Sequence, residues 1–169
     1  MKPAAKKYNT QYKKKVDVER DMYLPRSAPR ETMQCSGCGA FYHRRHWTLV
    51  PPGNFSAQPP RRRTLCPACA KIRDHYPGGE VRLAGIDSLE RGEIARILRN
   101  EEERARAKNP LERIMRLEAS RDGWRVETTT EKLAQRLGRA VHKARGGSVE
   151  YKWSHNNKFV RVIWQKDAA

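Results

Sequence analysis

The sequence lacks any long apolar run. No stretch of its 169 residues approaches the roughly 18 consecutive apolar residues of a membrane-spanning helix. The opening segment, residues 1–15, is basic but is not followed by the apolar stretch of a secretory signal. Apolar residues make up only 37% of the chain. These absences predict a soluble, cytoplasmic protein built from small modules rather than around one large core.

The common catalytic motifs are also missing. The chain has no Gly-x-x-x-x-Gly-Lys-Ser/Thr phosphate loop, no His-Glu-x-x-His and no Gly-x-Ser-x-Gly. A zinc deaminase needs His-x-Glu upstream of its second metal motif, and Cys66-Pro67-Ala68-Cys69 has no such partner. We therefore expect no enzymatic activity and no small-molecule substrate.

Acidic residues are scarce, and this scarcity indicates a polyanionic partner. The chain carries 19 Asp and Glu against 36 Lys and Arg, a net charge of +17. The excess lies in residues 1–30, 31–75 and 124–169, and the segment between the last two is neutral. Blocks of positive charge attract nucleic acid, because neutralising phosphates releases condensed counterions. The basic segments lack the amphipathic apolar face of a membrane-binding helix, so we expect no membrane partner.

The pattern along the chain predicts an α+β protein in four segments. These are a basic disordered arm at 1–34, a zinc ribbon with a Pro/Arg-rich insert at 35–75, a helical spacer at 76–120 and a β-α-β-β domain at 121–169. The spacer has a helical pattern over residues 87–118, in which Asn109 and Glu112 have the spacing of a capping box that restarts the helix. The expected core of the last domain consists of Trp124, Val126, Leu133, Leu137, Val141, Val149, Tyr151 and Val162.

Only four cysteines are present, and their spacing predicts one structural zinc ion. They form two Cys-x-x-Cys pairs, Cys35 with Cys38 and Cys66 with Cys69, separated by 27 residues. Four thiolates complete a tetrahedral shell and leave no position for a catalytic water. Two disulfides are less compatible with a chain that has no export signal. Spacing alone leaves iron open as the metal, and the nearby His43 and His46 are interpreted as surface residues.

Basic and aromatic residues together predict contacts with RNA, in which ammonium and guanidinium groups meet phosphates and rings stack on unpaired bases. Trp47 has two open interpretations, as a stacking residue or as part of the core. The candidate RNA-binding residues are Tyr12, Lys13, Lys14, Lys15, Tyr42, Arg44, Arg45, Arg61, Arg62 and Arg63.

The chain resembles a short bacterial relative of the archaeal and eukaryotic large-ribosomal-subunit export adaptors, the family named after nonsense-mediated decay. The resemblance rests on the four cysteines and on three stretches of the C-terminal segment, Trp124–Thr130 with Lys132–Ala134, Gly146–Val149 and Val160–Val162. Those adaptors carry more than one metal ribbon and further domains that this chain lacks. The resemblance therefore implies contact with ribosomes or structured RNA, without the export role.

We accordingly predict a zinc-stabilised RNA-binding protein that associates with ribosomes or ribosomal subunits, as an assembly, quality-control or stress-linked factor. Two alternatives stay open. One is a zinc-ribbon protein that binds DNA or the transcription machinery, and the other is a zinc-ribbon adaptor that binds protein.

Overall fold

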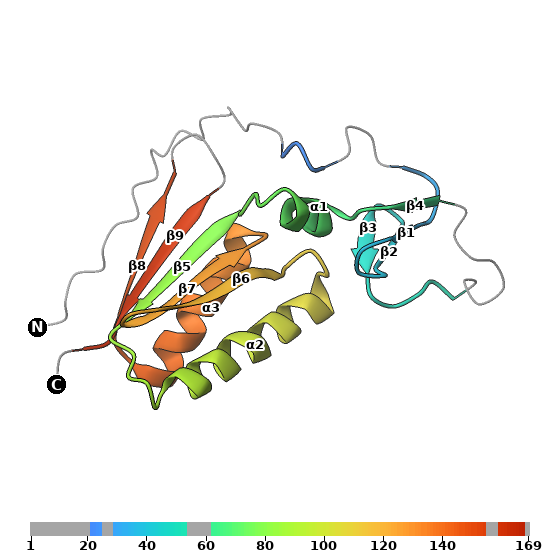
Figure 1. The fold of residues 1–169 in the computed structure, drawn as a ribbon. Helices are drawn as coiled ribbons and strands as arrows, with labels where there is room; N and C mark the ends of the chain where they lie inside the picture. The colour runs from blue at the N-terminus through green and yellow to red at the C-terminus, as the bar shows by residue number, and fades with distance from the viewer. Residues whose placement is uncertain (1–20, 25–28, 54–61, 155–158, 168–169) are drawn as a thin grey trace, which may run out of the picture.

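The computed structural model describes residues 21–24, 29–53, 62–154 and 159–167, which form two sheets and three helices (Figure 1). The predicted α+β class is confirmed. The elements are, in chain order, β1 (Met33–Cys35), β2 (Phe41–His43), β3 (His46–Thr48), β4 (Arg62–Thr64), α1 (Pro67–Arg73), β5 (Gly79–Ala84), α2 (Arg91–Lys108), β6 (Ile114–Ser120), β7 (Gly123–Thr128), α3 (Glu131–Arg145), β8 (Ser148–Trp153) and β9 (Val160–Gln165). No helix among the described residues is long and apolar enough to cross a membrane.

The small sheet brings the two cysteine pairs together. Its strand order is β3-β2-β1-β4, with β1 antiparallel to β2 and parallel to β4. Cys35 at the end of β1 is paired with Thr64 at the end of β4, two residues before Cys66. The chain between the two pairs therefore returns beside its own starting point. We call this part of the molecule, residues 29–53 and 62–75, the ribbon.

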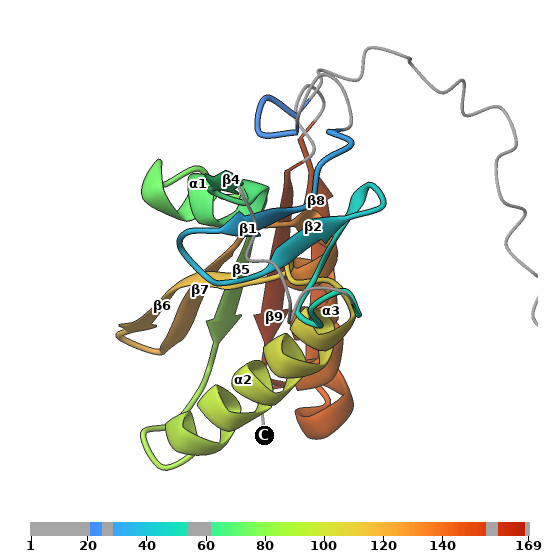
Figure 2. The same cartoon turned by 90° about the vertical axis from the view of Figure 1, so that its right-hand side faces the viewer.

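The large sheet has the order β6-β7-β5-β9-β8, with α2 and α3 on one face (Figures 1 and 2). The central strand β5 runs antiparallel to β7 and parallel to β9. Val81, Val126 and Val162 occupy one register across these three strands and are fully buried. They pack with Leu137 and Val141 of α3 in a single apolar cluster, which is the core of the larger unit.

Local signals explain α3. The Thr130 hydroxyl accepts a hydrogen bond from the Leu133 N–H at 3.2 Å and caps the helix. Gly146 ends it at a φ of 70°, a value that glycine adopts without strain. At Gly138 a Cβ would lie 2.4 Å from Val162 Cγ1, so the absence of a side chain lets the helix approach β9 closely. The predicted order of strand, helix and hairpin is confirmed here as β7, α3, β8 and β9.

The helical-spacer interpretation is wrong at two places. Residues 79–84 form β5, the central strand, because Val81 and Leu83 alternate into the core. The helix expected over 87–118 extends only over 91–108. Asn109 ends it instead of restarting it, since the Asn109 side chain accepts from the Leu111 N–H at 3.1 Å in a turn. The chain then continues as β6.

Most of the expected core residues are buried. The fully buried members are Val126, Leu133, Leu137, Val141 and Val162. Trp124 and Val149 are partly buried and pack against the same cluster. Tyr151 was expected in the core but is 37% exposed, because β8 is an edge strand at the margin of the sheet.

Candidate metal centre and the arginine surface of the ribbon

The four cysteines converge on one point. Cys35 ends β1, Cys38 lies in the following turn, Cys66 caps α1 and Cys69 lies in its first turn. Their sulfur atoms all lie within 4.8 Å of one another. Gly37 lines the centre, and a Cβ there would lie 3.0 Å from Cys69 Sγ. The predicted ligand set therefore assembles in the fold.

The geometry of this cluster fits zinc. A tetrahedral ion with Zn–S bonds of about 2.3 Å holds its sulfurs about 3.8 Å apart. Cys38 Sγ and Cys66 Sγ are 3.7 Å apart, and all four cysteines are free of disulfides. Four thiolates fill the shell, so the centre is a structural four-cysteine zinc site. His43 and His46 do not belong to the cluster, as predicted.

Burial and backbone hydrogen bonds change the pKa values of three of the four thiols. Burial raises the pKa of Cys69 to about 11 and also raises the pKa of Cys66. Burial acts in the same direction on Cys35, but hydrogen bonds from the backbone N–H groups of Cys66, Cys38 and Gly37 outweigh it and bring that pKa to about 7. A divalent cation must therefore displace protons from Cys66 and Cys69 when it binds.

An arginine from the larger unit reaches the metal centre. Arg113 Nη1 donates a hydrogen bond to Cys69 Sγ at 3.2 Å. A guanidinium at this distance offsets part of the negative charge that four thiolates place on a zinc ion. Sequence reasoning missed Arg113, which lies 44 residues from Cys69 and carries no motif.

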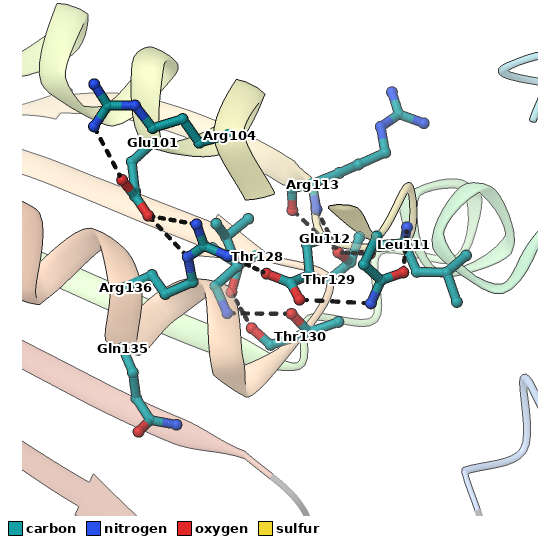
Figure 3. Close-up of polar contacts among 12 residues, drawn as sticks. Glu101, Arg104, Leu111, Glu112, Arg113, Thr128, Thr129, Thr130, Gln135 and Arg136 are labelled. Carbon is teal, nitrogen blue, oxygen red and sulfur yellow. Dashed lines mark hydrogen bonds and ion pairs between the residues drawn. The ribbon is translucent and has the colours of Figure 1, made fainter. Parts of the chain in front are cut away.

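The backbone around Arg113 is fixed at a polar junction (Figure 3). Arg113 N donates to the Thr129 hydroxyl at 2.9 Å, and that hydroxyl donates to Leu111 O at 2.5 Å. Lys71 of α1 donates from the other side to Thr129 O at 3.4 Å. Leu111 also packs against the cysteine cluster. The metal centre and the large sheet therefore share one junction.

Arg136 closes the same junction on the helical side. It pairs with Glu101 of α2 at 2.8 Å and with Glu112 at 3.6 Å (Figure 3). Glu112 is buried, and a buried carboxylate requires such a partner. The loop that presents Arg113 to the cysteines is thereby tied to α2 and α3.

The predicted RNA-binding residues fall into three groups. Arg44, Arg45, Arg62 and Arg63 are exposed on the ribbon. Tyr42 is only 5% exposed and packs on Trp47 with ring centroids 5.4 Å apart, which argues against an open stacking role for Tyr42. Tyr42 pairs with Met33 across β1 and β2, so the two side chains lie on the same face of the small sheet. The remaining candidates, Tyr12, Lys13, Lys14, Lys15 and Arg61, lie outside the described residues.

Arg44 and Arg45 occupy a costly backbone conformation. They are the two residues between His43 and His46, which pair across β2 and β3. Their φ angles are 47° and 69°, in the left-handed region that a two-residue hairpin turn requires. Asn and Gly are the usual residues there, and other side chains cost about 1–2 kcal/mol per residue. The turn therefore displays two guanidinium groups at the expense of stability.

The ribbon has few acids to neutralise its arginines. Its described acids are Glu31 and Asp74, and Asp74 pairs with Arg73 at 2.6 Å. In the part of the chain that the structure describes, five exposed ribbon arginines form no ion pair, namely Arg30, Arg44, Arg45, Arg62 and Arg63. In the larger unit Glu80 alone contacts Arg82, Arg125 and Arg161, whereas Arg96 and Arg99 of α2 are exposed and form no ion pair among the described residues.

The fold and the centre define an α+β protein with a four-cysteine zinc ribbon. Comparisons with protein-family models, with curated proteins and with solved structures find no match to this chain.

Proposed function

We propose that this chain is a non-enzymatic, zinc-stabilised RNA-binding protein that associates with ribosomes or ribosomal subunits as an assembly, quality-control or stress-linked factor. The observation that carries the proposal is the set of exposed, unpaired arginines on the ribbon that contains the four-cysteine site. Arginine without a protein partner offers its donors to phosphate, and a rigid support reduces the entropy lost on binding.

The Arg44–Arg45 turn supports the same conclusion. Two arginines in a conformation that disfavours them indicate a role other than stability. The resemblance to ribosomal export adaptors agrees with RNA as the polyanion and adds the ribosome as its source, although no family model matches the chain.

The test is sedimentation of the zinc-loaded chain with ribosomes through sucrose gradients, at a series of salt concentrations. Neutralisation of about six phosphates on single-stranded RNA gives a log–log slope of affinity against salt near −4. Arg44→Ala with Arg45→Ala should lower affinity and reduce the slope by about 1.4. Arg96→Ala with Arg99→Ala is the matched control, since these α2 arginines are also exposed and form no ion pair among the described residues.

Nuclease treatment separates the alternatives. Ribonuclease should release the protein from the ribosomal fractions, and deoxyribonuclease should not. Release by deoxyribonuclease alone would favour DNA. Co-sedimentation that neither nuclease nor salt disturbs would favour a protein adaptor and contradict the proposal.

A further inference from the structure

A cavity of about 270 Å³ opens beside the exposed arginines. One wall is the face of the small sheet that carries Met33, Tyr42, Trp47 and Arg62. The opposite wall is the segment 21–24, blue in Figure 1 and close to α1, which we call the strap. Among the described residues, none that lines the cavity is acidic.

The strap is held in place by a buried lysine. Lys71 Nζ pairs with Asp21 Oδ2 at 2.8 Å and lies 5.7 Å from the centre of the Tyr23 ring. Tyr23 also packs on Tyr76, with centroids 5.4 Å apart. Lys71 is only 9% exposed, so loss of Asp21 would leave the Lys71 charge largely buried without its carboxylate partner. These contacts join the strap to α1 and the residues after it, although 50 residues separate Asp21 from Lys71.

The composition of the walls restricts the ligand. Trp47 is half-buried, and its ring packs against Tyr42 with the two ring planes tilted by 57°. Arg62 lies at the cavity and forms no ion pair among the described residues. An organic cation would be repelled by this guanidinium, and an apolar peptide side chain would leave it without a partner. A flat ring with hydrogen-bond acceptors on its edge can stack on the aromatic wall and accept hydrogen bonds from the arginine.

We propose that this cavity binds one unpaired nucleobase of single-stranded RNA, stacked on Trp47, with Arg62 donating to the acceptor edge of the base. The inference rests on the proposed function and specifies how the ribbon distinguishes exposed bases from paired ones. The cavity is smaller than the roughly 300–1,000 Å³ of sites for drug-sized ligands, as expected for a single ring system. The neighbouring unpaired arginines would hold the phosphates on either side.

Two adjacent arginines provide a matched pair of variants. Arg62 and Arg63 are both exposed on β4, but strand alternation places their side chains on opposite faces, and only Arg62 lines the cavity. The probes are two single-stranded RNA octamers that differ only in one central nucleotide, which is either intact or abasic. Affinity for the full, zinc-loaded chain is measured by fluorescence anisotropy.

The parent should bind the intact octamer more tightly than the abasic one. Arg62→Ala should lower the affinity for the intact octamer by about tenfold and remove most of the difference in affinity between the two octamers. Arg63→Ala should lower the affinity for both octamers by the same factor and so preserve the difference between them. Tyr23→Ala, which removes a wall without changing the charge, should also reduce the difference while the zinc content stays at one ion per chain.

Equal effects of the Arg62 and Arg63 variants on both octamers would overturn the nucleobase site and leave the proposed function standing. A parent that binds the intact and abasic octamers equally, with a normal salt dependence, would do the same. A parent that binds neither octamer at any salt concentration would overturn both proposals.

Discussion

At the scale of single residues, the Arg113 side chain contacts the metal centre through one hydrogen bond to Cys69 Sγ. We predict that Arg113→Ala weakens zinc binding by about 10- to 100-fold, because the thiolates lose a donor that offsets their charge. The backbone bonds to Thr129 do not depend on the side chain, so the junction should persist. Competition with a chromogenic chelator measures the change.

The control for this variant is Arg116→Ala in β6. Arg116 is exposed and pairs with Glu118 at 2.6 Å, away from the cysteines. Its loss should leave zinc affinity unchanged. Equal zinc affinity for the Arg113 variant and the parent would show that the hydrogen bond to Cys69 is incidental.

The two kinds of residue at this centre differ in how far sequence could predict them. The four ligands were predictable, since Cys-x-x-Cys spacing itself directs two sulfurs to one point. Arg113 was not, because only the tertiary fold brings it to Cys69. Tyr42 was misread for a similar reason. Its basic neighbours suggested a surface position, but pairing with Met33 and Trp47 determines which face it occupies.

At the scale of elements, the β2–β3 turn exposes two arginine side chains in a backbone conformation that lowers the stability of the fold. Replacing Arg44 with Asn and Arg45 with Gly supplies the residues that a two-residue hairpin turn prefers. We predict that this double variant is about 1 kcal/mol more stable and binds RNA more weakly. Thermal unfolding of the zinc-loaded protein and RNA affinity are measured together.

The double alanine variant of the same turn separates the two effects. Alanine removes both charges but keeps a Cβ at positive φ. It should therefore lose RNA affinity to the same extent without the gain in stability. A gain in stability as large as that of the Asn-Gly variant would contradict the explanation by backbone strain.

The position of β5 determines which fragments can fold. β5 joins β7 to β9 through six paired residues on each side. We predict that a fragment of residues 76–169 unfolds cooperatively in the absence of zinc, whereas residues 121–169 do not, because they lack the central strand. Chemical denaturation followed by circular dichroism measures both. A cooperative transition in the shorter fragment would show that β5 is dispensable.

Sequence patterns predicted some elements of this sheet and missed others. α3 was predictable because its cap, apolar stripe and terminal glycine all agree. β5 has only a short alternation of Val81 and Leu83, which a neighbouring helical pattern obscured. β6 was missed because Asn109 and Glu112 have the spacing of a capping box. In the structure, these two side chains form a contact at 3.5 Å within a turn.

At the scale of the whole molecule, the metal should control the ribbon and leave the large sheet folded. We predict that chelation of zinc abolishes most RNA binding, since the arginine surface loses its support, while helical circular dichroism falls only slightly. Lowering the pH should favour metal loss, because protons compete for Cys66 and Cys69, whose pKa values burial raises. Zinc content, circular dichroism and RNA affinity are followed during the chelator titration. RNA binding that survives complete zinc removal would contradict this prediction.

The pairing of β5 with β9 has a consequence for the emergence of this protein from the ribosome that makes it. Gly79 pairs with Val160, so β5 cannot form its pairing with β9 until roughly eighty further residues have been synthesised. At translation rates of about 5–20 residues per second, this wait lasts several seconds. The cysteines, by contrast, lie close together in sequence and can bind zinc as soon as Cys69 has left the exit tunnel. The nascent chain would thus carry a four-cysteine module that can hold zinc before the larger unit and its Arg113 fold against it.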